Sequence, residues 1–254
     1  MMNHKPERAA WFVMWGAFLT FLVLCAAMPL GAQYYLEHAT TPQLATLEVI
    51  GGTVRAREPS AAAPIAVTKT VQLPEGTAIE TDENSRAILT FSDGSTTVLF
   101  PNTQIFLRQM RVATFPWGVE PLSIILEQTR GRLRVGAAQQ VPQANETPRP
   151  RVFQVFTQHL GATLAEGSYA VEIRGDATEV SVRDGTATVS AQDKTVKVGR
   201  SQRTLARRNE APLASLPAAQ DLIVNGDFMD PRSRGWNDQI EIPSPAGAPA
   251  GRLS

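Results

Sequence analysis

The stretch GTAIETDENSRAILTFSDGSTTVL, residues 76–99, decides the fold class. Its run RAILTF places Ala87 and Leu89 on the same face of an extended chain, since side chains alternate along a strand. A second run, STTVLF, follows directly after Asp93 and Gly94. Asp-Gly between two such runs favours a hairpin, because a type I′ turn needs a positive φ at both central residues. The stretch therefore predicts two antiparallel strands joined by a tight turn.

A second stretch, GSYAVEIRGDATEVSVRDGTATVS at residues 167–190, echoes the first at an offset of 91 residues. The pair Asp184 and Gly185 then falls on the pair Asp93 and Gly94. The favoured explanation of this similarity is a duplicated hairpin, and the next is the recurrence of a common turn. A twin ligand site at the two aspartates ranks last, because Asp before Gly already has a backbone role in a tight turn. We therefore interpret all four residues as structural turns.

The same alternation continues along most of the chain, in runs such as LEVIGGTVRA, TQIFLRQM, SIILEQ, GRLRVG, VFQVFT and TEVSV. No amphipathic helical run of ten or more residues occurs outside the N-terminal segment. The polar, proline-rich segment 137–151 is typical of a long loop between two halves. The pattern predicts a mainly β fold, with one all-β domain over residues 47–205.

The segment WFVMWGAFLTFLVLCAAMPL, residues 11–30, contains no charge and is long enough to cross a bilayer as a helix. Lys5 and Arg8 precede it, and the next basic residue is Arg55. By the positive-inside rule the N-terminus is cytoplasmic and the rest is exported. The sequence thus predicts a single-pass cell-membrane protein with a cytoplasmic tail at 1–10, a transmembrane helix at 11–31 and a tether at 32–46.

Two alternatives to a retained anchor stay open. A cleaved signal peptide usually has a shorter apolar region and a better small-residue cleavage site. A lipoprotein would need a small residue before Cys25, and Leu24 stands there. In the favoured reading, aromatic residues near both ends of the span act as interfacial anchors, namely Trp11, Trp15, Tyr34 and Tyr35.

The composition gives no sign of catalysis or of nucleic-acid binding. Basic and acidic residues balance at 24 each, so no net charge favours a polyanion. Cys25 is the only cysteine, and the three histidines have no metal-ligand spacing. His159 is interpreted as an ordinary turn residue. We expect a protein that is not an enzyme and that uses no cofactor and no metal.

Two surface features are candidate interaction sites. The basic run KVGRSQRTLARR is either a contact for anionic polymer or lipid, or simply a solvated strand end. The loop TFPWGVEP carries aromatics suited to an interface or to a small hydrophobic cluster. The candidate residues are Phe115, Trp117, Arg200, Arg203, Arg207 and Arg208.

The order of several motifs between residues 74 and 110 resembles the FecR-domain family. These motifs are Gly76, Ile79 and Thr81; then Ser85, Arg86 and Ala87; then Asp93, Gly94 and Ser95; and then Thr103, Ile105 and Leu107. The resemblance covers roughly residues 47–205. It implies an exported domain on a single-pass regulator, which contacts an outer-membrane receptor while a cytoplasmic region engages a sigma factor.

The chain departs from that plan at both ends. A ten-residue tail is too short to present a folded face, so we expect no direct sigma-factor binding. After a linker at 206–221, the segment 222–254 contains NGDF and GW, which resemble the start of a carbohydrate-binding jelly roll, and we expect it to be truncated or disordered. The favoured function is a non-catalytic envelope module for protein interaction or signal sensing, with an envelope protein as partner. The alternative is a cell-wall or glycan-binding surface protein.

Overall fold

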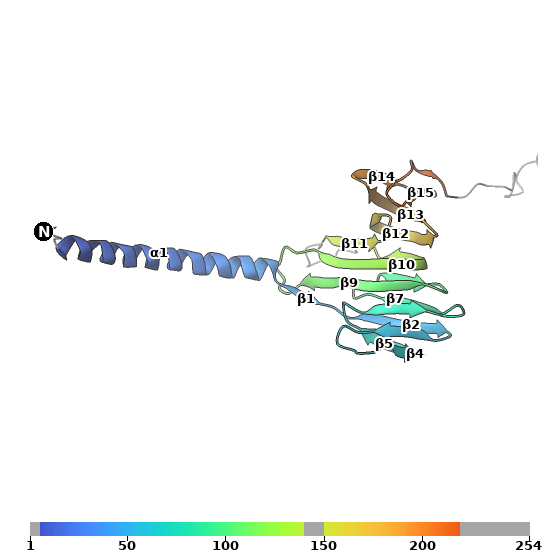
Figure 1. Cartoon of the computed structure of the whole chain (residues 1–254), viewed down its shortest axis with the longest axis horizontal. Helices are drawn as coiled ribbons and strands as arrows, with labels where there is room; N and C mark the ends of the chain where they lie inside the picture. Colours follow the sequence, from blue (N-terminus) through green and yellow to red (C-terminus); the bar gives the residue numbers. More distant parts are fainter. Residues whose placement is uncertain (1–5, 140–149, 219–254) are drawn as a thin grey trace, which may run out of the picture. The chain divides into compact units, whose positions relative to one another are not determined.

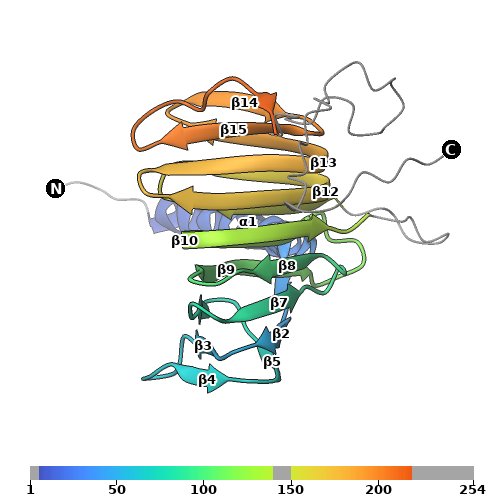
Figure 2. The same cartoon turned by 90° about the vertical axis from the view of Figure 1, so that its right-hand side faces the viewer.

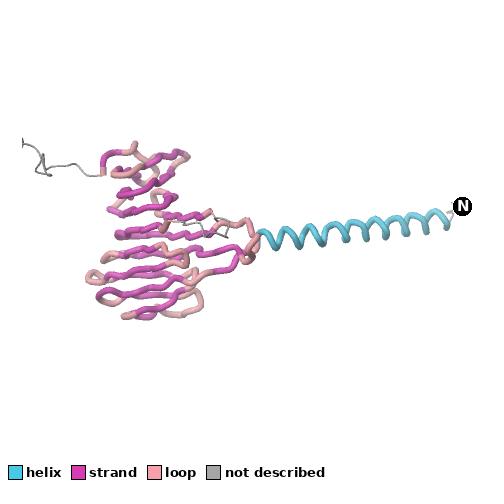
Figure 3. Tube along the Cα trace, turned by 180° about the vertical axis from the view of Figure 1, so that it is seen from behind, coloured by secondary structure: helices cyan, strands magenta, loops and turns pink. Residues whose placement is uncertain are grey.

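The N-terminal part is one long helix, and the computed structural model describes residues 6–139 and 150–218. Helix α1 (Pro6–His38) appears in cyan in Figure 3. Its segment Trp11–His38 is long and apolar enough to cross a membrane by length and composition. The predicted apolar helix is therefore confirmed, although it continues past residue 31.

Strands make up most of the remainder, so the predicted mainly β fold is confirmed (Figure 1). Their bounds are β1 (Thr40–Pro42), β2 (Ala45–Gly51), β3 (Val54–Arg57), β4 (Ile65–Val67), β5 (Thr70–Leu73), β6 (Ala78–Thr81), β7 (Arg86–Thr90), β8 (Thr96–Leu99), β9 (Gln104–Ala113), β10 (Leu122–Ala137), β11 (Arg151–Phe156), β12 (Gly161–Arg174), β13 (Ala177–Ala191), β14 (Lys194–Val198), β15 (Gln202–Arg207) and β16 (Leu216–Pro217).

The strands form two rows that share three long strands. One row runs β4, β3, β6, β9, the first half of β10, β11, the first half of β12, the second half of β13, and β14. The other runs β5, β2, β7, β8, the second half of β10, the second half of β12, the first half of β13, β15 and β16. Because β10, β12 and β13 pass between the rows, one continuous sheet results, seen as stacked strands in Figure 2.

The hydrophobic core unites side chains from both rows. Phe91, which follows β7, and Phe153 of β11 meet edge to face with ring centroids 5.7 Å apart. Ala87 and Leu89 are completely buried, while Arg86 on the opposite face is exposed. Ala87 and Leu89 therefore share one face of the strand, as the alternation predicted, and that face is the buried one.

Gly131 marks the point where β10 changes rows. Before it β10 pairs with β9, and after it β10 pairs with β8 and β12. Its φ is +84°, and a Cβ there would lie 2.5 Å from the carbonyl oxygen of Asn102. Glycine is required here both by the backbone conformation and by the close approach of the β8–β9 connection.

The first predicted hairpin exists, but its turn is not type I′. Of the residues in this loop only Gly94 has a positive φ, at +81°. The Phe91 amide donates to the Ser95 carbonyl at 2.9 Å, and the Gly94 amide donates to the Phe91 carbonyl at 3.0 Å. The loop therefore has three residues with a left-handed glycine last, another common hairpin form.

The second Asp-Gly pair is not in a turn, so the duplicated-hairpin interpretation is wrong. Asp184 and Gly185 lie inside β13, where Gly185 pairs with Gly167 of β12. Both glycines have a positive φ, +86° and +143°, at the place where β12 and β13 change rows. The hairpin between these strands turns instead at Gly175 and Asp176. The two stretches are therefore similar although their glycines have different roles: Gly94 lies in a hairpin turn, and Gly185 lies inside a strand where it changes rows.

The segments expected to connect domains are more ordered than predicted. Residues 32–38 continue α1, and β1 and the start of β2 occupy most of the remaining predicted tether. Within the predicted linker, the Leu213 amide donates to the Leu205 carbonyl at 2.9 Å, and β16 pairs with β15. The segment 222–254, with its jelly-roll-like motifs, lies outside the described residues.

Candidate functional site

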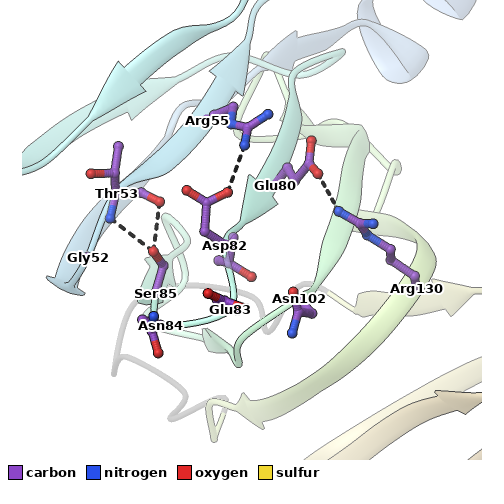
Figure 4. A pocket seen from close by; sticks show the side chains of 11 residues that line it. Gly52, Thr53, Arg55, Glu80, Asp82, Glu83, Asn84, Ser85, Asn102 and Arg130 are labelled. Atoms are coloured by element: carbon purple, nitrogen blue, oxygen red, sulfur yellow. Dashed lines mark hydrogen bonds and ion pairs between the residues drawn. The ribbon is translucent and has the colours of Figure 1, made fainter.

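An open cleft of about 580 Å³ lies at the corner where the chain crosses between the rows (Figure 4). It is built from β3, the C-terminal end of β6, the middle of β10 and the connections beside these strands. Its lining is entirely polar or glycine: Gly52, Thr53, Arg55, Glu80, Thr81, Asp82, Glu83, Asn84, Ser85, Asn102 and Arg130.

The loop between β6 and β7 forms one wall of the cleft, and hydrogen bonds hold it to its own backbone, to the β8–β9 connection and to Thr53, which precedes β3. The amides of Ser85 and Asn102 both donate to the Asp82 carbonyl, at 3.2 and 3.1 Å. The Ser85 hydroxyl accepts from the Thr53 amide at 2.9 Å and donates to the Thr53 carbonyl at 2.8 Å. Gly52 permits this approach, because a Cβ at that position would overlap Ser85.

Two buried threonines form the floor behind this wall. The Thr81 hydroxyl donates to the Phe100 carbonyl at 2.7 Å and accepts from the Thr103 amide at 2.9 Å. The Thr103 hydroxyl in turn donates to the Arg132 carbonyl at 2.9 Å and accepts from the Arg132 amide at 3.0 Å. These side chains bond to backbone groups where the strands change rows, which fixes the position of Thr81 in the cleft lining.

Charged side chains of both signs line the mouth. Arg55 pairs with Asp82 at 2.9 Å, and Arg130 pairs with Glu80; Figure 4 shows both contacts. Each of these side chains is roughly one third to one half exposed. Exposed ion pairs contribute only about 0–1 kcal/mol to stability, because water solvates the separated charges well. Both pairs can therefore open and offer their charges to a ligand at little cost.

The lining of the cleft is rich in charged and polar groups. Its lining supplies two guanidinium groups, three carboxylates, two carboxamides and several hydroxyls, but no histidine or cysteine. Within residues 6–139 and 150–218, no group of three or more His, Cys, Asp or Glu side chains is arranged to hold a metal ion. A polar, charged ligand or an extended peptide fits such a surface better than an apolar one.

The cleft and the end of α1 lie at opposite ends of β9. β1, which follows α1, pairs with the C-terminal end of β9, as Thr40 opposite Ala113. The cleft residue Asn102 precedes the N-terminal end of the same strand. Ten strand residues span about 30 Å, so the cleft and the end of the helix are separated by roughly that distance.

None of the candidate interaction residues predicted from the sequence lines this cleft, although Thr81 and Ser85, which belong to the FecR-like motifs, do. Phe115 and Trp117 are in the β9–β10 connection, with parallel rings 5.4 Å apart. The run TDENS between two strands could have indicated a polar loop. Arg55 and Arg130 are distant in sequence, and no local signal connects them.

The four candidate arginines do not form one uniform cationic patch. Arg203 pairs with Glu179 at 3.2 Å, and Arg200 lies 3.8 Å from Asp184. Arg208 donates to the side chain of Gln158 at 3.4 Å, and Arg207 is exposed. Acidic partners therefore offset much of the positive charge that the sequence suggested for this run.

Asp93 has a role beyond its turn. Its carboxylate accepts from the Ser95 amide at 2.9 Å and pairs with Arg151 at 3.0 Å. The Arg151 side chain is 4% exposed and that of Asp93 is 10% exposed. The same guanidinium donates to the Ala138 carbonyl at 2.6 Å. This buried pair ties the β7–β8 hairpin to the start of β11.

His159 is a turn residue, as expected, but it is buried. It lies between β11 and β12, and its Nδ1 is 2.8 Å from the Thr178 hydroxyl. Its Nε2 is buried without a hydrogen-bond partner. Burial, assisted by the charge of Arg208, lowers the pKa of His159 below its ordinary value of 6.5, against an opposing effect of Asp176.

This shift predicts a pH-dependent stability. Because the folded pKa is lower, the unfolded chain binds a proton more readily, so stability should fall as the pH drops below about 6.5 and level off below the folded pKa. Urea unfolding of the detergent-solubilised chain between about pH 8 and about pH 5 measures it. His159→Gln should flatten this part of the profile; an unchanged profile in the variant would contradict the assignment.

Comparisons with known proteins find similarity over part of the chain. Two crystal structures of a candidate anti-sigma factor from Parabacteroides distasonis are 17% and 15% identical to the chain, with TM-scores of 0.39 and 0.40. Each covers 55% of this chain, which in turn spans 59% of their length. No curated protein matches the chain. Residues 77–188, which include the wall, the floor and Arg130 of the cleft, match the family model described as FecR protein.

Proposed function

We propose that the chain is a membrane-anchored envelope module that binds a protein partner through the cleft, without catalysing a reaction. In this proposal α1 stays in the membrane with its N-terminus in the cytoplasm, and the β unit is exported. The partner is an envelope protein that presents a polar, charged segment to the two ion pairs, Arg55–Asp82 and Arg130–Glu80.

The observation that carries the proposal is the placement of the cleft. It opens at the end of β9 opposite the strand that follows α1, so a partner can reach it without meeting the bilayer. The match of residues 77–188 to the FecR model supports a signal-sensing role in the envelope. The asymmetry of Lys5 and Arg8 before the span supports the orientation.

Site-specific photo-crosslinking in cells tests the proposal. A photoreactive residue at Asn84, which is exposed in the cleft wall, should capture one envelope protein on irradiation. The same group at Lys194, which is exposed on β14 and outside the cleft, is the matched control and should not capture that protein.

A charge swap separates binding from folding. The double variant Glu80→Arg with Arg130→Glu can keep an ion pair but reverses the charges that a partner meets. Its stability should stay within about 1 kcal/mol of the parent, since the pair is exposed. The crosslink from Asn84 should nevertheless be lost. A crosslink of undiminished yield in the swapped variant would rule out recognition by these charges.

The glycan-binding alternative rests on residues 222–254, which lie outside the described part of the chain and outside the FecR match. A crosslinked product that glycan-degrading enzymes shorten and proteases do not would favour it. The expectation that residues 1–10 do not hold a sigma factor directly stays a prediction.

A further inference from the structure

The connection between β9 and β10 is tied to the end of α1. The Val119 amide donates to the Glu37 carbonyl at 2.9 Å, and the Thr114 amide donates to the Ala39 carbonyl at 2.8 Å. The hydroxyls of Thr41 and Thr114 are 2.8 Å apart. Carbonyls in the last turn of a helix have no intrahelical partner, so the connection completes the end of α1. Figure 1 shows the two segments side by side.

This connection, residues 114–119, presents aromatic and aliphatic surface. A hydrogen bond of 3.0 Å from the Gly118 amide to the Phe115 carbonyl closes a tight turn. The rings of Phe115 and Trp117 stack with an interplanar angle of 8°. Trp117 is 62% exposed and Val119 is 59% exposed. Such large, solvent-exposed apolar side chains on a loop often mark a surface that contacts a partner or a membrane.

The neighbouring turn of α1 has the same character. Tyr34 and Tyr35 are both exposed. If Leu30 ends the hydrocarbon-spanning part, a rise of about 1.5 Å per residue places the tyrosines about 6–8 Å beyond it. The headgroup region on each side of a bilayer is about 5–8 Å deep, and Trp and Tyr are enriched there.

We infer that residues 114–119 form a second membrane contact, with Trp117 and Val119 at the outer boundary of the headgroup layer, next to the tyrosines of α1. The occupant of this surface is the lipid of the membrane that α1 crosses, because the hydrogen bond to Glu37 holds Val119 about 10 Å past Leu30, close to where the headgroup layer meets water. The inference rests on the proposed anchor and adds a second point of attachment. Two attachments restrict rotation of the β unit and keep the cleft directed away from the lipid.

Tryptophan fluorescence of the full chain in lipid nanodiscs tests the inference. A variant with Trp11, Trp15 and Trp236 replaced by phenylalanine reports Trp117 alone. We expect a blue-shifted emission maximum, and loss of emission when the lipid carries a quencher near its headgroup. A quencher at the end of the acyl chain should have less effect.

Two control variants keep the outcomes distinct. A variant that retains only Trp15 should be quenched by lipid if α1 is embedded, whatever the loop does. In a variant without the four native tryptophans, Ile50→Trp reports an exposed position near the cleft end of β2 and should show no lipid quenching. Quenching of Trp15 without quenching of Trp117 overturns the inference and leaves the anchor standing. If lipid quenches neither Trp15 nor Trp117, the membrane anchor is overturned as well.

Emission from Trp117 that is shifted but insensitive to lipid quenchers would also overturn the inference. That result would mean that another protein, or a second copy of the chain, covers the connection instead of the bilayer. Chemical crosslinking of the same nanodiscs would then distinguish the two.

Discussion

Gly185→Ala is expected to destabilise the β unit by about 2–5 kcal/mol. A positive φ costs a residue with a Cβ about 1–2 kcal/mol, and overpacking in a closed site adds about 1–3 kcal/mol. The added Cβ would overlap the Glu166 carbonyl oxygen and the Tyr169 hydroxyl. That hydroxyl accepts from the Thr186 amide, and its single proton is within hydrogen-bond distance of the Glu166 and Thr186 carbonyls, so it cannot move freely. Urea unfolding followed by circular dichroism in the strand region measures the loss.

Gly94→Ala is the matched control for this effect. Gly94 has nearly the same φ, +81° against +86°, but a Cβ there would meet only the Ala138 side chain at 4.0 Å. The control should therefore lose only the conformational contribution, about 1–2 kcal/mol. Equal losses of unfolding free energy in the two variants would mean that Gly185 is not in a crowded position where the rows meet.

Asp93→Asn is expected to destabilise the protein by about 3–5 kcal/mol, because it leaves the buried Arg151 guanidinium without a counter-charge. A role in the turn alone would make this change nearly neutral, since Asn-Gly forms the same turns. Asp184→Asn should change stability by no more than about 0.5 kcal/mol, because Asp184 is two-thirds exposed and lies 3.8 Å from the exposed Arg200.

A double-mutant cycle measures the pair directly. Arg151→Met alone leaves the Asp93 carboxylate buried, so it should also be destabilising. Combined with Asp93→Asn it should cost less than the sum of the two single changes, because no uncompensated charge remains. Additive losses would show that the two side chains do not interact.

Local pattern predicted the strands well, because each signal lies within a few residues. The alternation in RAILTF correctly placed Ala87 and Leu89 on one face of the strand, and that face is buried. The position of the first hairpin was also correct, although its turn type was not. The second Asp-Gly pair led to a wrong prediction of a turn. Gly185 instead lies where β13 changes rows, and it faces Gly167 because β12 and β13 pair. Local sequence does not specify which strands will pair.

The cleft and the buried ion pair were not predictable for the same reason. Arg151 reaches Asp93 across 58 residues, and Arg130 reaches Glu80 across 50 residues. Only the tertiary fold brings these charges together. The sequence indicated that the loop that carries Asp82 is polar, but the role of this loop as a wall depends on the hydrogen bonds between Ser85 and Thr53.

Thiol labelling tests most directly whether α1 holds the β unit and its cleft outside the cytoplasm. Cys25→Ala removes the only native thiol, and Asn84→Cys then places a single thiol in the exposed wall of the cleft. In spheroplasts a membrane-impermeant maleimide should label this variant without lysis. The control Asn3→Cys, in the same background, should react only after lysis. Labelling of the Asn84→Cys variant only after lysis would place the cleft in the cytoplasm and contradict the account.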